Sequence, residues 1–267
     1  MTAKPEIAVL LPAYNPGAGL VQTLDSIRKQ TVPYQLFLVD DGSKVKPDYK
    51  VALKGIPHTL IELPKNVGIT LALNAGLAEI LKGDFKYVAR MDCGDEMTPD
   101  RLALQKQYMD AHGEIDILGS WIEMVYTEVD RRFVLDWPID HDNITRDLWK
   151  NMSLSHPAMM VRTSSWRKLG PYSVSYEAAE DYELVRRAMQ GGYRFHNLGK
   201  VLLIKTENRD SISWRKRRRQ LFSRLKAQWR YRKLGNPACV KGLVKTAITL
   251  LIPTPMVHWL KAVFAKN

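Results

Sequence analysis

Short apolar runs alternate with helical patterns through the first hundred residues, and this alternation limits the possible folds more than any other feature of the chain. Each run has the length and apolar content of a buried strand. The predicted strands lie at residues 7–11, 36–39, 59–63 and 87–91, and the clearest helical patterns between them lie at 20–30 and 70–81. Because strands that alternate with helices form parallel sheets covered on both faces, we predict an α/β fold with a mostly parallel central sheet.

The pattern is less regular after about residue 112. Before it, we expect a helix with Thr98 as its N-cap and Pro99 as its first helical residue, since both residue types favour those positions. Further strands are predicted at 115–125, 159–161 and 201–205, and a further helix at 178–190. No low-complexity linker precedes residue 210, so we treat 1–100 and 101–210 as two halves of one domain.

The composition is that of a folded globular protein, because 45% of the 267 residues are hydrophobic. Cys93 and Cys239 are the two cysteines, too few for a disulfide framework, which fits a reducing compartment. The N-terminus leads directly into the first predicted strand, without the apolar segment of a secretory signal. We therefore expect the active region to lie in the cytoplasm.

Positive charge is concentrated in residues 211–267. This tail contains 14 Lys and Arg and no Asp or Glu, whereas the net charge of the whole chain is +12, so the rest is slightly acidic. Apolar residues recur there near helical spacing beside basic clusters, which predicts a basic amphipathic helix of the kind that lies on a membrane surface. These apolar residues are Trp214, Leu221, Phe222, Leu225 and Trp229. Nowhere does an uninterrupted apolar stretch reach the ~20 residues of a membrane span.

Carboxylates follow two of the predicted strands. Asp40 and Asp41 end the second strand, and Asp92 and Asp95 follow the fourth. An Asx turn closed by Gly42 would explain one acid of the first pair, but not two adjacent carboxylates. Open α/β sheets bind their ligands at the carboxyl ends of the strands. We therefore predict a polar ligand at this edge, and one that can bring a metal ion.

These motifs, in their order and spacing, resemble those of an inverting family 2 glycosyltransferase of the GT-A fold. The resemblance covers residues 7–210. The matching pieces are Leu11-Pro12-Ala13-Tyr14-Asn15, Val39-Asp40-Asp41-Gly42-Ser43, Asn66-Val67-Gly68 with Ala72, Asn74 and Gly76, Arg90-Met91-Asp92, and Glu180-Asp181. It implies a GT-A (Rossmann-like) sheet flanked by helices, with 1–100 binding the nucleotide sugar and 101–210 serving the acceptor and catalysis.

The resemblance also implies which residues contact the donor. The ring of Tyr14 would stack on the nucleobase. By analogy with proteins that bind single-stranded nucleic acids, such stacking is worth roughly 1–3 kcal/mol. The structural alternative is that Tyr14 only covers the sheet edge. Asp41 would accept hydrogen bonds from the base, and Asp40 would support the loop or the ribose. The expected substrate-binding residues are Pro12, Tyr14, Asp40, Asp41, Asn66, Gly68, Asn74, Arg90, Asp92, His156 and Lys205.

A divalent cation, Mg²⁺ or Mn²⁺, is implied at the position of the family's Asp-x-Asp site. Here the second Asp of that motif is replaced by Gly94, which leaves Asp92 and Asp95 as the metal ligands, together with donor phosphates. Alternatively, Asp92 holds the ribose. The plain alternative for the whole segment is a solvated turn before a helix.

Glu180 and Asp181 are the catalytic candidates. By resemblance, Asp181 is the base that takes the proton of the acceptor hydroxyl, with Glu180 beside it. Acids at a helix start also interact favourably with the helix dipole, which is the structural alternative. His156 lies in a His-Pro element near the acceptor side, although a lone His is more often structural. Lys205 or Arg209 would face the diphosphate, and the His that relatives carry before the Ser-Ile-Ser segment is missing.

We therefore predict a glycosyltransferase that moves a sugar from a nucleotide-diphosphate donor to a hydroxyl acceptor. The basic tail suggests a lipid-linked glycan acceptor in surface polysaccharide assembly, with 211–267 holding the enzyme on the anionic inner face of the cell membrane. Two alternatives stay open. A nucleic-acid-binding protein would use the same tail, but it does not explain the acidic strand ends, so we expect no nucleic acid partner. A catalytically inactive relative that binds sugar nucleotides is the other, prompted by Gly94.

Overall fold

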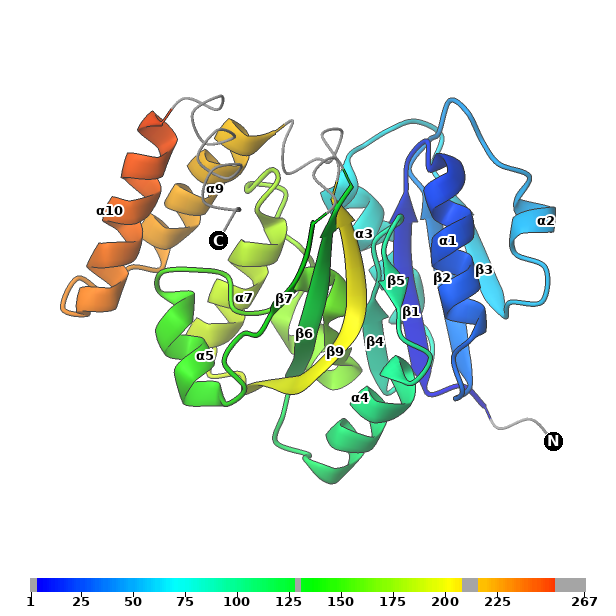
Figure 1. Ribbon diagram of the computed structural model, residues 1–267, viewed down its shortest axis with the longest axis horizontal. Helices are drawn as coiled ribbons and strands as arrows, with labels where there is room; N and C mark the ends of the chain where they lie inside the picture. The colour runs from blue at the N-terminus through cyan, green and yellow to red at the C-terminus, as the bar shows by residue number, and fades with distance from the viewer. Residues whose placement is uncertain (1–3, 128–130, 208–215, 253–267) are drawn as a thin grey trace.

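A single twisted sheet forms the centre of the molecule (Figure 1). The structure is a computed structural model and describes residues 4–127, 131–207 and 216–252. The strand order is β3-β2-β1-β4-β8-β6-β9-β5, with β7 paired to β6. The strands are β1 (Ile7–Ala13), β2 (Tyr34–Asp40), β3 (His58–Glu62), β4 (Tyr87–Arg90), β5 (Glu96–Met97), β6 (Ile117–Tyr126), β7 (Arg131–Leu135), β8 (Met160–Arg162) and β9 (Phe195–Glu207).

Most strands point the same way, as predicted. β3, β2, β1 and β4 pair in parallel, and β6 and β9 follow the same direction beyond β8. β8 and β5 run the opposite way, and so does β7. The carboxyl ends of six strands therefore meet at one edge of the sheet, and the reversed strands β8 and β5 begin at that same edge.

Helices cover both faces of the sheet, because side chains alternate between two cores. In β1, Ile7, Val9 and Leu11 face one core, and Ala8 and Leu10 face the other. The first core includes α1 and α4, and the second includes α3, α5, α6 and α7. The helices are α1 (Gly17–Arg28), α2 (Tyr49–Ala52), α3 (Ile69–Ile80), α4 (Arg101–Ala111), α5 (His141–Leu148), the 3₁₀ helix η1 (His156–Ala158), α6 (Thr163–Leu169), α7 (Glu180–Gln190), α9 (Arg217–Arg230) and α10 (Pro237–Leu251).

Two expected boundaries were wrong. The helix predicted from Thr98 begins instead at Arg101, with Asp100 at the N-cap position. The Thr98 amide donates to the carbonyl of Leu202, 3.0 Å away, and so continues the pairing of β5 with β9. That ladder bond holds Thr98 outside the helix. The first strand, predicted at 7–11, also extends further, through Pro12 to Ala13.

The basic tail folds into a pair of packed helices rather than one. α9 packs against α7 and α10, and the Arg217 guanidinium donates to the Thr249 carbonyl at 3.0 Å (Figure 1). Within the described ranges no helix has the length and apolar content needed to cross a bilayer. The predicted features at 208–215, including Arg209 and Trp214, and those at 253–267 lie outside the described residues.

Candidate active site

The predicted site residues gather at the edge where the carboxyl ends of the strands meet. Tyr14 follows β1, Asp40 ends β2 and Asp92 follows β4. The reversed strands bring two more residues to this edge, because His156 precedes β8 and Asp95 precedes β5. Residues from separate parts of the sequence, such as Asp92 and His156, are thus neighbours in space, as expected for a ligand site of an open α/β sheet.

Asp41 is the most highly connected acid on the donor side. Its carboxylate accepts hydrogen bonds from the Val67 amide at 2.8 Å, the Gly68 amide at 2.9 Å and the Asn66 side-chain amide at 2.9 Å. The side chain is buried. Asp41 therefore fixes the 66–68 loop, which leads into α3, whatever further contact it makes with a base.

Gly42 allows the loop that leads into α3 to approach the backbone of the turn after β2. Its φ is +65°, a region that favours glycine, and a Cβ placed there would lie 2.2 Å from the carbonyl carbon of Lys65. The two loops after β2 and β3 are therefore in direct backbone contact, and no other residue fits at position 42 without a shift of one of them.

Tyr14 stands at the rim, with 43% of its surface exposed. Its loop is tied to the Asp40–Ser43 turn, since the Asn15 amide donates to the Ser43 hydroxyl at 2.8 Å and the Asn15 side-chain oxygen accepts from the Lys44 amide at 2.9 Å. An exposed ring on an anchored loop is suited to stacking against a planar ligand.

Asp40 is fully buried at the end of β2. One carboxylate oxygen accepts from the Ser43 amide at 2.9 Å, and the other lies 3.7 Å from the Lys46 ammonium. These contacts are those of a loop support, which is one of the two roles predicted for it.

Arg90 replaces a backbone hydrogen bond of the sheet that Pro12 cannot make. Residue 12 faces β4, and in this register its amide would donate to the Met91 carbonyl. Proline has no amide hydrogen, and the Arg90 guanidinium donates to that carbonyl instead. Its other end donates to the Asp92 carboxylate. Pro12 is buried, so its contribution is to this arrangement within the sheet.

Asp92, Asp95 and Lys205 form the charged centre of the edge. The Lys205 ammonium lies 3.8 Å from an Asp92 oxygen and 3.6 Å from an Asp95 oxygen. Burial opposes the charge of Asp92, but Arg90 and Lys205 outweigh it and lower the pKa of that carboxyl. Burial raises the pKa of Asp95, and the neighbouring Asp92 charge raises it further.

The turn through Gly94 explains the departure from Asp-x-Asp. The Asp95 amide donates to the Asp92 carbonyl at 3.3 Å, and Gly94, at the third position of this turn, has a φ of +97°. The Thr23 hydroxyl fixes the turn by accepting from the Gly94 amide at 2.9 Å and donating to the Asp95 carbonyl at 2.8 Å. An aspartate at 94 would be strained by the backbone, although its Cβ would meet open space.

The two acids suit a hard divalent cation. Each has an oxygen near the Lys205 ammonium, and the buried Asp95 oxygen Oδ2 has no hydrogen-bond partner among the described residues. Within the described ranges no group of three or more His, Cys, Asp and Glu is placed to hold a metal. Asp92 and Asp95 therefore fit a cation only if other oxygens, such as donor phosphates, complete its shell.

Glu180 and Asp181 begin α7 and are poorly neutralised. Burial raises the pKa of Glu180 to about 7, and the adjacent Asp181 charge contributes to that rise. Burial also raises the pKa of Asp181, with a further rise from Asp92 and an opposing effect of the Tyr182 amide, which donates to it at 2.6 Å. Carboxyls with pKa values moved toward neutrality are suited to proton transfer.

His156 is held by a partner that sequence analysis did not find. Its Nε2 lies 2.7 Å from the Tyr172 hydroxyl, and both side chains are buried. Burial and the nearby Arg90 lower the pKa of His156 to about 3, so the ring is neutral. Asn74 binds the Tyr172 backbone through both ends of its amide, at 2.8 and 2.9 Å. Asn74 thereby connects α3 to the His156 environment.

The sequence analysis also did not identify two arginines that contact the site residues or their neighbours in the chain. Arg101 is fully buried and donates to the Arg90 carbonyl at 2.9 Å, and Arg224 of α9 stacks 4.8 Å from the ring of Tyr182, next to Asp181. Neither is near a motif.

Comparisons with known proteins agree with this geometry. The family model of glycosyl transferase family 2 matches residues 8–170. The amylovoran biosynthesis glycosyltransferase AmsE of Erwinia amylovora is 27% identical over 92% of this chain and 92% of its own length. A UDP-Gal:alpha-D-GlcNAc-diphosphoundecaprenol beta-1,3-galactosyltransferase of Escherichia coli is 26% identical, over 85% of this chain and 83% of its own.

Solved structures share the fold at lower identity. S. aureus TarS 1-349 in complex with UDP-GlcNAc has a TM-score of 0.67 and 18% identity, and the match covers 84% of this chain but 66% of that one. The mannosyltransferase PcManGT of Pyrobaculum calidifontis, in complex with GDP-Man and Mn²⁺, has a TM-score of 0.63 and 18% identity, over all of this chain and 77% of that one. GT-A enzymes typically use divalent cations. Since the family model covers more than half of the chain, this protein is a GT-A glycosyltransferase and belongs to glycosyl transferase family 2.

Proposed function

We propose that the protein transfers a sugar, with inversion at the anomeric carbon, from a nucleotide-diphosphate donor to a hydroxyl of a lipid-linked glycan. The observation that carries the proposal is the convergence on one sheet edge of a donor side built by Asp41 and an acceptor side built by Glu180 and Asp181. A sugar bound between them would have its leaving diphosphate at Lys205 and its open face toward α7.

Each side has its own task in this reaction. Tyr14 stacks on the base, and the loop fixed by Asp41 borders the nucleotide. Asp181 takes the proton of the acceptor hydroxyl as that oxygen attacks, so inversion needs only a single displacement. Lys205 and Arg90 face the charge that develops on the leaving diphosphate, where fixed positive groups have the largest effect.

Asp92 and Asp95 are the residues that would hold Mg²⁺ or Mn²⁺. When bound, the cation supplies Lewis-acid neutralisation of the diphosphate. The mannosyltransferase structure with Mn²⁺ supports this assignment for a protein of the same fold.

The acceptor and the membrane are proposed from two further observations. The galactosyltransferase relative is named for a diphosphoundecaprenol-linked acceptor. On α10, Val240, Val244, Ile248 and Leu251 recur every three or four residues and are all exposed, with Lys241 and Lys245 beside them. Such a stripe fits an anionic bilayer surface, which would keep the enzyme at the cytoplasmic side of the membrane.

The test of the transfer reaction begins with donor binding. Thermal shifts with UDP-, GDP- and dTDP-sugars, with and without Mn²⁺, should identify one nucleotide class that stabilises the protein, and more strongly with the ion. Product analysis by NMR with that donor should then show the opposite anomeric configuration to the donor sugar. No stabilisation by any of these donors, or a product of retained configuration, would refute the proposal.

The membrane assignment is tested separately. Co-sedimentation with phosphatidylglycerol vesicles should be lost in V244D/I248D and kept in V134D, which places one such charge on an exposed valine of β7. Equal binding of all three proteins would exclude the α10 stripe as the contact surface.

A further inference from the structure

The geometry points to a second binding site, between α9 and α10, for the diphosphate and first lipid carbons of the acceptor. This inference rests on the proposed function, since it names the acceptor class of the same active site. It identifies the acceptor by chemistry: a phosphate or diphosphate ester of a long apolar chain.

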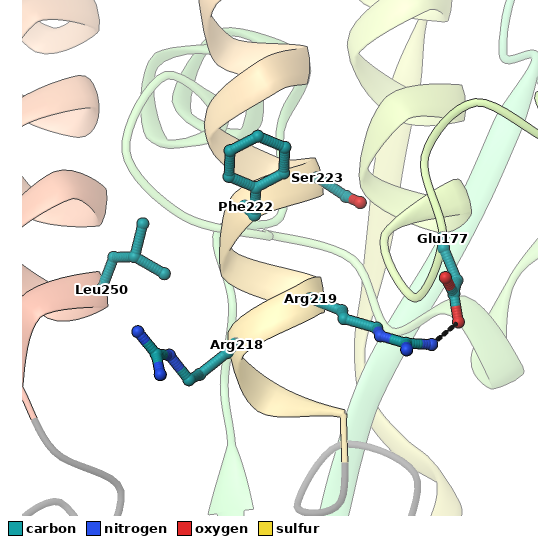
Figure 2. A pocket seen from close by; sticks show the side chains of 6 residues that line it. All are labelled: Glu177, Arg218, Arg219, Phe222, Ser223 and Leu250. Atoms are coloured by element: carbon teal, nitrogen blue, oxygen red, sulfur yellow. Dashed lines mark hydrogen bonds and ion pairs between the residues drawn. The ribbon is translucent and has the colours of Figure 1, made fainter.

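The site is a surface pocket of about 410 Å³ (Figure 2). It is lined by Glu177, Arg218, Arg219, Phe222, Ser223 and Leu250. Figure 2 shows Arg218 pointing toward α10, and Arg219 pointing across toward Glu177, which precedes α7. The two guanidinium groups thus leave α9 in opposite directions, and the residues that line the pocket come from α9, α10 and the segment before α7.

The charge of the pocket matches a phosphate group. Arg218 has no ion-pair or hydrogen-bond partner among the described residues. Arg219 has one ion pair, with Glu177 at 3.0 Å, and Lys216 supports the same carboxylate at 3.1 Å. An ion pair this exposed is weakly held, so Arg219 can exchange Glu177 for a ligand. Guanidinium forks bind phosphate oxygens through paired hydrogen bonds, and two of them suit a diphosphate.

The apolar part of the pocket matches an alkyl chain. Phe222 is 63% exposed, and Leu250 faces it across the groove. Leu251, at the end of α10, is 82% exposed and belongs to the stripe proposed to meet the bilayer. A lipid that leaves the pocket past these residues would continue along the stripe toward the membrane, with its charged end at the arginines.

The position of the pocket matches the reaction. Glu177 lies four residues before Asp181, so even a fully extended chain would separate them by at most ~14 Å. α9 is packed on the start of α7, with the Arg224 guanidinium 4.8 Å from the ring of Tyr182. An acceptor sugar with its hydroxyl at Asp181 would therefore have its anomeric diphosphate within reach of Arg218 and Arg219.

The experiment measures binding of undecyl diphosphate by calorimetry while the donor site is filled with UDP and Mn²⁺. Wild-type protein should bind it, R218A/R219A should bind at least about tenfold more weakly, and R218K/R219K should keep part of the affinity. R230A/R232A removes two positive charges at and just beyond the other end of α9 and should bind within about twofold of wild type. Circular dichroism should find all variants folded.

Four outcomes would overturn the inference. They are equal binding by wild type and R218A/R219A, a matching loss in R230A/R232A, affinity for inorganic diphosphate as high as for the undecyl ester, and equally tight binding to phosphatidylglycerol vesicles that R218A/R219A also loses. The last would make the pocket a general anionic lipid site. Failure of the proposed function would give a different result, because it is tested by donor binding and by the product configuration of the wild-type protein. Neither measurement uses the arginine variants of this pocket.

Discussion

The acids of the donor side and the acids of the acceptor side have opposite surroundings. Asp41 accepts three hydrogen bonds from the 66–68 loop, so its charge is satisfied inside the protein. Glu180 is buried and Asp181 is partly buried, with few donors around them, and the Glu180 oxygen Oε2 has no hydrogen-bond partner among the described residues. A satisfied carboxylate shapes a loop, whereas an unsatisfied one is ready to take a proton.

The comparison separates two contributions at one sheet edge: support of the loops on the β2 side, and carboxyls suited to proton transfer on the α7 side. On the β2 side, the sequence forms a rigid backbone cradle in which Gly42 and the 66–68 loop touch. On the α7 side, the helix start holds charge that the protein does not neutralise. Mutations on the first side should therefore affect stability and donor affinity, and those on the second should affect rate.

The largest expected effect is that of D181N. Loss of the base should lower kcat by about 10²–10⁴-fold with donor affinity unchanged, because the amide cannot accept the hydroxyl proton. E180Q is the matched neighbour and should lose less. Steady-state kinetics together with donor titration measure both, and an E180Q defect as large as that of D181N would assign the base to Glu180.

G42A should produce the largest loss of stability. A Cβ 2.2 Å from the Lys65 backbone, at a φ of +65°, should cost about 3 kcal/mol and weaken donor binding. G55A is the control, because Gly55 has a φ of +78° and open space around it, so it should cost about 1 kcal/mol. Urea unfolding compares them, and equal losses would show that the contact between the two loops contributes nothing.

E180Q should also change how stability depends on pH. The pKa of Glu180 rises from its ordinary 4.5 to about 7 in the folded protein, so between these values the folded state binds more protons than the unfolded chain. Wild-type stability should therefore fall as pH rises through this window, by on the order of 3 kcal/mol from this group, and E180Q should lack that part of the slope. Parallel slopes from pH 4.5 to 8 would contradict an unsatisfied Glu180.

The smallest effect belongs to Tyr14. Y14A should raise the donor KM by about tenfold with kcat maintained, because it removes stacking on the base, and Y14F should behave like wild type. Thermal stability should change little, since 43% of the surface of Tyr14 is exposed. A Y14A protein with wild-type donor KM would leave Tyr14 as a cover for the sheet edge.

The sheet and its edge motifs were predictable because they depend on local patterns. The apolar run before Asp40 and the turn at Gly42 are readable along the chain, and the GT-A fold is confirmed. The start of α4 was not, since a single bond from Thr98 to β9 overrides the local capping signal. Tyr172 and Arg224 escaped for the same reason: their partners, His156 and Tyr182, meet them only after the helices pack. The roles assigned to the site residues stay predictions.

The proline in β1 has a consequence for how such enzymes diverge. Because Pro12 offers no amide hydrogen to the carbonyl of Met91, the guanidinium of Arg90 is recruited to it and is thereby aimed at Asp92. Any other residue at position 12 would compete with Arg90 for that carbonyl. Positions 12 and 90 should therefore substitute together across homologous sequences, as a covarying pair.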